Sequence, residues 1–362
     1  MTRPASDLSL RTSPAARPTL ASLLLRASLV AALILAGLAL YGLGPGGGFY
    51  IKMARAPLAP QDAAPYYRES LLHVVLAHAL GLTGALQFRL FVLGFWWSGV
   101  AALLFALRLA HLHLALVALV LLTHPAAMIV HSWACHPDAP VFLLTALLLL
   151  VRRPAIVAPL AFVMALANLA MTAVVAVSLA LLWLARHDRL RALATCAGAA
   201  LGAAACKLTL ALAGVHLARD RLTIAAQQDP STLLTRWLSP GWPVVYTLHF
   251  AHLLWLPALY LTLRSVDRPL ARALLATQAL ALLAATFAED TTRIFALLAW
   301  APLVFCLCRA LAHLEHTRDR FHLRPLVALA VLVSLLAPKC FAWKGELRTL
   351  DDARTYRRAH LF

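Results

Sequence analysis

Long apolar runs, broken by short polar connections, recur from residue 20 to residue 338. A helix of about 20 apolar residues spans the hydrocarbon core of a bilayer and satisfies its own backbone hydrogen bonds there. The chain is 62% hydrophobic and only 13% charged, with a mean hydropathy of +0.80, whereas charged residues make up about 25% of a soluble domain. The sequence therefore predicts an all-α fold, a polytopic transmembrane helical bundle.

The apolar windows and the breaks between them predict about eleven spans, within a range of roughly nine to twelve. The windows are 22–43, 89–107, 111–130, 139–151, 154–168, 170–185, 190–215, 243–263, 270–288, 294–312 and 324–338. Arginines precede the first window, so we expect a cytoplasmic N-terminus and an uncleaved signal-anchor. Residues 66–86 contain two histidines and flanking charges, which favour a helix lying in the membrane interface over a full span.

This layout divides the chain into a cytoplasmic tail (1–21), a transmembrane domain (22–338) and a basic C-terminal tail (339–362). Two longer outer loops are expected, at 44–69 and 216–242. The first contains "GPGGG", for which a flexible hinge is the favoured interpretation. The second contains "PSTLLTRWL", which predicts a short amphipathic helix with Ser231 as its cap.

The net charge of +17 would suggest nucleic acid as a partner of a soluble protein. In a membrane protein, Lys and Arg collect in the cytoplasmic loops, and the arginines here follow the predicted cytoplasmic loops closely. We therefore expect no nucleic-acid partner and a multi-pass protein of a bacterial inner membrane, since the Arg-, Ala- and Leu-rich composition is typical of a high-GC bacterial genome. The basic C-terminal tail is an exception, because an odd number of spans places it outside.

The acidic residues of the predicted outer face are the most informative polar positions. Asp138 in "HPDAP" and Glu289 and Asp290 in "AEDTTR" lie in very short connections. A carboxylate at the membrane surface is desolvated on one side, which makes it a better proton acceptor near neutral pH. Structural explanations are open as well: Asp138 can cap a helix, Asp290 or Thr291 can cap the next one, and Glu289 can pair with Arg293.

Other polar residues also interrupt apolar sequence. Lys207 falls inside a predicted span, where a lysine faces a cavity or a partner, or extends to the interface. "APYYRES" places Tyr67 at the headgroup level and makes Arg68 a candidate partner for a lipid phosphate. His249 and His252 have a spacing that suits a metal ion, but no third ligand is obvious.

The order of these features resembles the GT-C superfamily of integral-membrane glycosyltransferases, in its small bacterial type. "APYYRESLL" is similar to the Pro-aromatic-Tyr-Arg stretch that often follows the first outer loop of those proteins, and "DTTRIFALLAWAPL" is similar to their late Asp-x-x-Arg segment. The likeness covers most of the chain as a layout. The chain departs from the family in "GGGFY", where an acid often precedes the tyrosine, and in "ANLAM", where many relatives carry an Arg-Glu pair.

The resemblance implies an inverting transfer of a sugar from a polyprenyl-phosphate donor to a glycan or lipid acceptor at the outer membrane face. By position, it assigns the acid of the first outer loop, a base or a ligand of Mg²⁺ or Mn²⁺, to Asp62. Asp138 and Asp290 are the other candidate catalytic acids. The candidate substrate contacts are Tyr67, Arg68, His136, Lys207, Glu289 and Arg293, with both arginines on the donor phosphate.

Two other functions are compatible with the sequence. A transporter or flippase for a lipid-linked substrate needs polar groups along a path through the bilayer and often internal repeats. The predicted membrane interior contains little charge besides Lys207, and the two halves show no convincing similarity. A polysaccharide polymerase would use a similar arginine site at the outer face and stays open as an alternative.

Overall fold

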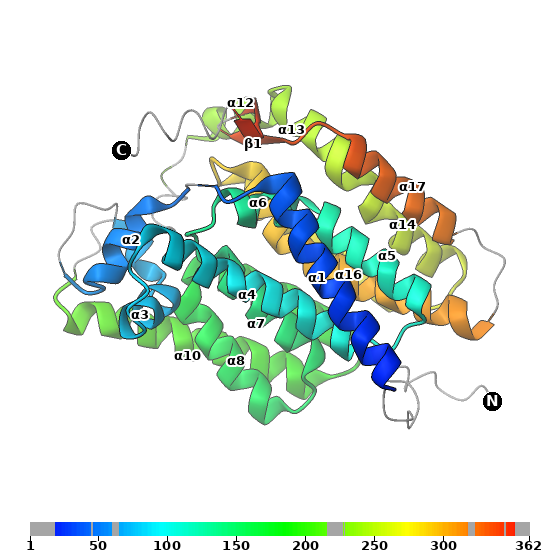
Figure 1. The fold of residues 1–362 in the computed structure, drawn as a ribbon, viewed down its shortest axis with the longest axis horizontal. Helices are drawn as coiled ribbons and strands as arrows, with labels where there is room; N and C mark the ends of the chain where they lie inside the picture. The colour runs from blue at the N-terminus through cyan, green and yellow to red at the C-terminus, as the bar shows by residue number, and fades with distance from the viewer. Residues whose placement is uncertain are drawn as a thin grey trace.

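The computed structural model describes residues 19–44, 46–59, 65–215, 227, 229–317, 323–343 and 345–351. They form a helical bundle with one small β-hairpin (Figure 1). The first half comprises α1 (Leu20–Tyr41), α2 (Gly48–Arg55), the 3₁₀-helix η1 (Pro65–Glu69), α3 (Leu72–Ala79), α4 (Ala85–Ala106), α5 (His111–Thr123), α6 (Pro125–Ser132), α7 (Asp138–Leu150), α8 (Pro154–Ala167) and α9 (Leu169–Ala185). The second half comprises α10 (Arg189–Leu212), α12 (Pro230–Leu238), α13 (Gly241–Val245), the π-helix η2 (Tyr246–Ala251), α14 (His252–Leu263), α15 (Arg268–Thr286), α16 (Thr291–Thr317), α17 (Leu323–Leu336), β1 (Cys340–Trp343) and β2 (Glu346–Thr349).

Several helices are suited to crossing a bilayer, so the chain is an all-α membrane protein. In the described residues, α1, α4, α10, α15 and most of α16 are long and apolar enough to span. Two bent helix pairs, α5 with α6 (48°) and α13–η2 with α14 (52°), raise the number of candidate spans from 5 to 7. The shorter apolar helices α7, α8, α9 and α17 are only about 20–26 Å long at the rise of an α-helix. The predicted eleven spans therefore require these four helices to cross as well.

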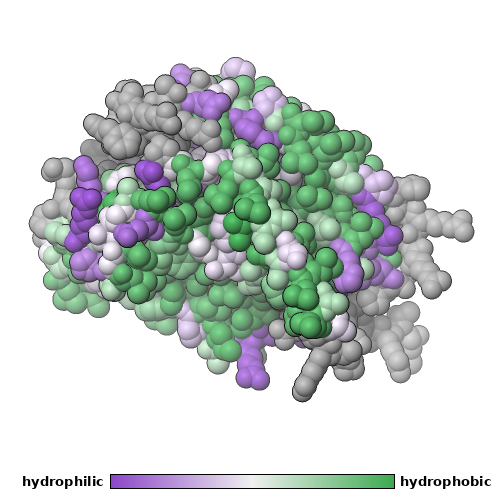
Figure 2. Space-filling model, in the orientation of Figure 1, coloured by the Kyte–Doolittle hydropathy of each residue, from purple (hydrophilic) through white to green (hydrophobic). Residues whose placement is uncertain are grey.

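Apolar side chains cover the outside of the bundle, as a lipid environment requires. Leu24 and Leu35 on α1 and Leu201 and Leu208 on α10 are each more than half exposed. Figure 2 shows apolar residues across most of one face, with hydrophilic residues gathered toward its edges. The central helix is α16, because 94% of its apolar window is buried inside the protein.

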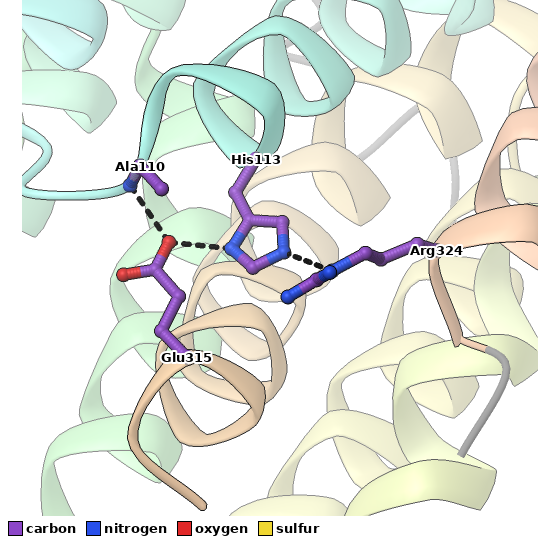
Figure 3. Close-up of polar contacts among 4 residues, drawn as sticks. All are labelled: Ala110, His113, Glu315 and Arg324. Carbon is purple, nitrogen blue, oxygen red and sulfur yellow. Dashed lines mark hydrogen bonds and ion pairs between the residues drawn. The ribbon is translucent and has the colours of Figure 1, made fainter. Parts of the chain in front are cut away.

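The bundle has two ends, which we name the Asp138 end, where α7 and α16 begin, and the Glu315 end, where α16 finishes. Figure 3 shows the contacts that join α5, α16 and α17 at the Glu315 end. Glu315 Oε1 accepts hydrogen bonds from the backbone N–H of Ala110 (2.7 Å) and from His113 Nδ1 (2.5 Å). Arg324 Nε donates to His113 Nε2 (2.6 Å).

A second group of polar contacts joins the end of α9, the start of α15 and α16. Asp267 accepts a hydrogen bond from Arg186 at 2.8 Å, and Arg309 Nε lies 3.7 Å from the same carboxylate oxygen. The Asp267 side chain is only 9% exposed. Asp267 and Glu315 therefore connect helices in largely buried positions.

The segment expected as a basic tail begins with an ordered hairpin. β1 and β2 pair antiparallel, with Cys340 opposite Thr349. Ala342 N–H donates to Thr292 Oγ1 (2.8 Å), and Thr291 Oγ1 donates to the Ala342 carbonyl (3.3 Å). The hairpin thus covers the start of α16, and its two strands, Cys340–Trp343 and Glu346–Thr349, belong to the folded body at the Asp138 end.

The structure differs in detail from the helices predicted at 66–86 and around "PSTLLTRWL". The expected interfacial helix at 66–86 is divided into η1 and α3, and α4 already begins at Ala85. The amphipathic helix predicted around "PSTLLTRWL" is α12, but it begins at Pro230 directly after Asp229, so Ser231 lies inside its first turn.

Helices α8 and α10 approach so closely that glycine is required on α10. A Cβ atom added at Gly198 would lie 2.2 Å from the carbonyl oxygen of Ala158, and one at Gly202 would lie 2.3 Å from that of Phe162. Small residues four positions apart allow two membrane helices to pack backbone against backbone.

Gly198→Val should therefore separate α8 from α10 and lower the free energy of unfolding by about 1–3 kcal/mol, the usual cost of overpacking. Unfolding in detergent micelles, followed by circular dichroism, measures this change. Ala204→Val, on the exposed side of α10, is the matched control and should leave stability nearly unchanged. Equal effects of the two substitutions would contradict the proposed packing.

Candidate functional site

Asp138 and Arg293 form a bidentate ion pair, although 155 positions separate them in the chain. Arg293 Nε donates to Asp138 Oδ2 at 2.6 Å, and Arg293 Nη2 donates to Asp138 Oδ1 at 2.8 Å. The Asp138 side chain is 1% exposed and the Arg293 side chain 12%. Two parallel charge-assisted bonds are the strongest arrangement available to this pair, and they join the first turns of α7 and α16.

Asp138 and Asp290 were both candidates for helix caps, and in the structure only Asp290 has this role. Asp290 Oδ1 accepts a hydrogen bond from the backbone N–H of Arg293 (3.3 Å), which confirms its role as the cap of α16. Asp138 does not cap α7: it is the first residue of that helix, and Pro137 occupies the cap position without a side-chain hydrogen bond. The carboxylate of Asp138 is directed to Arg293 instead.

The positive ends of two helices therefore meet at this ion pair. The first turns of α7 and α16 carry partial positive charge from their backbone N–H groups, and the Arg293 guanidinium adds a full charge. Asp138, Asp290 and Tyr50 are the electrostatic neighbours that stabilise this guanidinium. The Trp133 ring centre lies 5.8 Å from it. The site thus combines two helix N-termini and a guanidinium, which Asp138 and Asp290 neutralise, with an aromatic wall.

Aromatic rings from four segments pack beside the ion pair. The ring of His136 lies 5.2 Å from Tyr50 and 5.0 Å from Trp133, both edge to face. Phe49 lies 3.8 Å from Tyr67, so η1 is joined to the same group. We call the following set the aromatic cluster: Phe49, Tyr50, Tyr67, His73, Trp133 and His136.

The glycines of "GPGGG" bring α2 against the segment that carries His136. Gly44 N–H donates to the His131 carbonyl (2.8 Å), and Cys135 N–H donates to the Gly46 carbonyl (3.3 Å). A Cβ at Gly47, whose φ is +87°, would lie 2.6 Å from His136 Cδ2. The glycines therefore serve close packing at the site, where the sequence favoured a flexible hinge.

His73 is a fully buried histidine of the aromatic cluster. It lies on α3, outside the candidate spans, and is fully buried with its ring centre 4.9 Å from that of Tyr50. Burial lowers the pKa of His73 from 6.5 to about 3, and the nearby Cys135 backbone opposes this shift only in part. His73 is therefore neutral throughout the physiological pH range.

Lys207 and Glu289, two other predicted substrate contacts, interact with residues other than Asp138 and Arg293. Lys207 Nζ donates to Glu69 Oε1 at 2.5 Å, and Glu69 is buried while Lys207 is 41% exposed. Glu289 is half exposed and lies 3.9 Å from Arg236 of α12, whereas Arg293 binds Asp138.

The structure brings together part of the predicted site. Asp138, Asp290, Arg293 and His136 lie in one region, and Tyr67 is connected to it through the aromatic cluster. Arg68 on η1 is half-buried next to Tyr67. Asp62 lies outside the described residues.

The donor set around Arg293 fits an anion better than a divalent cation. Both oxygens of Asp138 accept from Arg293, and one oxygen of Asp290 caps α16. No group of three or more His, Cys, Asp or Glu side chains suited to a metal ion occurs within the described ranges. The divalent cation implied by the resemblance stays a prediction, since it was assigned to Asp62.

Three residues of this region were not among the sequence-based candidates: Tyr50, His73 and Trp133. The sequence contains these residues close to the candidates, but only within short segments of the chain. Trp133 lies three positions before His136 in "HSWACHPD", and Tyr50 ends "GGGFY". Only the fold shows that these segments and α3 pack against one another.

Comparison with known proteins gives no independent assignment. No protein-family model matches the chain, and no curated protein or solved structure matches it either. We therefore infer the function from the arrangement of the residues in this site.

The burial of His73 predicts a pH-dependent stability. Its folded pKa lies below the ordinary value of 6.5, so the unfolded chain binds a proton first as the pH falls. The contribution of neutral His73 to the free energy of unfolding is therefore fully present above pH 6.5. Below pH 6.5 this contribution decreases by about 1.4 kcal/mol per pH unit. His73→Phe should flatten this dependence in thermal unfolding between pH 6.5 and about pH 5.

His78→Gln is the matched control, because His78 lies on the exposed side of the same helix. This variant retains His73 and should keep the wild-type pH dependence. A His73→Phe variant that loses stability on acidification as steeply as the wild type would show that His73 is not buried in its neutral form.

Proposed function

We propose that this protein is a membrane glycosyltransferase that transfers a sugar from a polyprenyl-phosphate donor to a glycan or lipid acceptor. The observation that supports it best is the buried pair of Asp138 and Arg293 where α7 and α16 begin. A guanidinium between two helix N-termini suits a phosphate. The rings of the aromatic cluster combine apolar faces with polar edges, which suits a sugar.

The proposed membrane topology has eleven crossings, with the Asp138 end at the outer face of a bacterial inner membrane. Contacts at both ends of the shorter helices support it. Arg191, at the start of α10, donates to the carbonyl of Leu149 at the finish of α7 (3.0 Å). The Leu71 N–H donates to the carbonyl of Leu166 at the finish of α8 (2.9 Å). The bilayer adapts to short helices by local thinning at modest cost.

The charge distribution supports the same orientation. Arg186 and Arg309 meet at the Glu315 end, with Arg264 after α14 on the same side. Such an excess of arginine is typical of cytoplasmic loops. The hairpin of β1 and β2 lies at the Asp138 end, as an odd number of crossings requires.

In this proposal Arg293 binds the donor phosphate and stabilises the charge that develops as it departs. Asp138 and Asp290 are the candidate bases, and Asp62 is a third that the resemblance alone supports. Tyr67 and His136 contact the sugar or the acceptor. We assign no role in transfer to Lys207 and Glu289, because Glu69 and Arg236 engage them.

A transporter or flippase for a lipid-linked substrate is the second candidate. Its supporting observation is that the two bent helix pairs meet, with the ring of His124 at the first bend 5.7 Å from Phe250 in η2. Interrupted helices often form the binding sites of transporters. A polysaccharide polymerase is a variant of the transferase proposal, with a growing glycan as the acceptor.

The transferase proposal predicts that Arg293→Gln membranes lose sugar transfer by about a hundredfold or more, since the departing phosphate loses its main electrostatic partner. Arg293→Lys should restore only part of it, because lysine has no fork for bidentate binding. The assay measures release of polyprenyl phosphate from a panel of polyprenyl-phosphate sugars in proteoliposomes. Arg186→Gln, at the opposite end, is the control and should retain activity.

Two results would contradict the transferase proposal. One is full transfer in Arg293→Gln, Asp138→Asn and Asp290→Asn alike. The other is movement of intact donor across the membrane without release of polyprenyl phosphate, which is the outcome that the transporter alternative predicts.

A further inference from the structure

The roles proposed for Asp138 and Arg293 compete with the contact that the two side chains make with each other. Arg293 uses Nε and Nη2 to bind Asp138, so these two donors are occupied. Asp138 uses both of its carboxylate oxygens in the same contact, so each oxygen already accepts one hydrogen bond from Arg293. A substrate phosphate that binds this edge of the guanidinium has to open the contact.

The position of the Asp138 carboxylate is one that a substrate anion would also favour. It faces a guanidinium at the starts of two helices, which is the setting in which proteins bind phosphate. A carboxylate and a phosphate present similar pairs of oxygens to the fork of an arginine. The Asp138 carboxylate thus occupies Arg293 in the way that a phosphate oxygen pair would.

We propose that a lipid-linked substrate phosphate displaces Asp138 from Arg293, and that the released Asp138 carboxylate then serves as the base. This inference rests on the proposed transferase function and describes how its site is switched on. Without substrate, the ion pair keeps the base blocked. The substrate phosphate therefore both binds and activates the site.

The exposure of the two side chains favours approach of the phosphate to Arg293 rather than to Asp138. Arg293 is the more exposed partner, at 12% against 1% for Asp138, so an incoming anion reaches the guanidinium first. Asp290 and Trp133 remain beside Arg293 after the exchange. The released carboxylate stays in the first turn of α7, where the helix dipole still stabilises its charge.

The chemical step then balances. The O–H bond of the acceptor hydroxyl breaks, and its proton passes to the Asp138 carboxylate. The acceptor oxygen forms a bond to the anomeric carbon of the sugar. The bond between that carbon and the phosphate oxygen breaks, and the polyprenyl phosphate departs with the electron pair, held by Arg293. Attack opposite to the departing phosphate gives inversion.

The ion pair of Asp267 and Arg186 at the Glu315 end provides a matched comparison. It is also largely buried, with a distance of 2.8 Å. Asp267 additionally caps α15 through the N–H of Leu270 (3.2 Å) and has Arg309 as a second cation nearby. Its carboxylate is tied to three partners, so we expect no exchange with phosphate there.

Binding of farnesyl phosphate, a short polyprenyl phosphate, to the detergent-solubilised full chain tests the proposal by calorimetry. Asp138→Asn removes the internal competitor and should bind farnesyl phosphate about tenfold more tightly than the wild type. Arg293→Gln should bind it at least about tenfold more weakly. Asp267→Asn should bind it as the wild type does. Inorganic phosphate, used in parallel, should bind more weakly than farnesyl phosphate if the lipid part contributes.

A second measurement uses the wild-type chain and does not depend on the folding of any variant. A hydrophobic carbodiimide modifies carboxyl groups that are free of ion pairs, and peptide mass spectrometry locates the product. Farnesyl phosphate should increase the modification of Asp138 severalfold and leave that of Asp267 unchanged. Unchanged or reduced modification of Asp138 would overturn the exchange.

The outcomes separate this inference from the function on which it rests. If Arg293→Gln abolishes farnesyl phosphate binding but Asp138→Asn binds it no more tightly than the wild type, the exchange is wrong and the transferase proposal survives. If no form of the protein binds farnesyl phosphate, both are wrong. Tighter binding of inorganic phosphate than of farnesyl phosphate would overturn the lipid-linked substrate.

Discussion

The bidentate ion pair between Asp138 and Arg293 is the interaction on which the rest of the Asp138 end depends. It connects the first turns of α7 and of α16, the most buried of the five long candidate spans. The hairpin packs on Thr291 and Thr292 in the same turn of α16. Because removing one partner of a buried pair leaves an uncompensated charge, the position of α16 and the contacts above it are all coupled to this pair.

The two ends of the bundle use charge for different purposes. At the Glu315 end, Glu315 contacts His113 and a backbone N–H, and Asp267 is held by two arginines and a helix cap, so each carboxylate joins several helices at once. At the Asp138 end, both oxygens of Asp138 accept hydrogen bonds from Arg293, which lies beside Trp133 of the aromatic cluster. The proposed exchange depends on this difference, because a carboxylate that is held by one arginine is displaced more easily than one that is held by three groups.

The parts of the fold that hydropathy and local capping determine could be predicted from the sequence. The long apolar helices, α12 and the capping role of Asp290 are in this class, since each depends on residues within one or two turns. The partner of Asp138 could not be predicted, because it lies 155 residues away. The same limit applies to the hairpin on α16 and to Gly202, whose importance comes from the Phe162 carbonyl on another helix. For the site, the sequence indicated the charged residues but not Tyr50 or His73.

A double-mutant cycle on the free energy of unfolding tests the central claim most directly. Asp138→Asn and Arg293→Gln should each cost about 3–5 kcal/mol, because each leaves a buried charge without its partner. The double variant should cost less than the sum of the two by about 2 kcal/mol or more, since it removes both charges. Additivity within about 0.5 kcal/mol would contradict the account, because it would show that the two side chains do not interact.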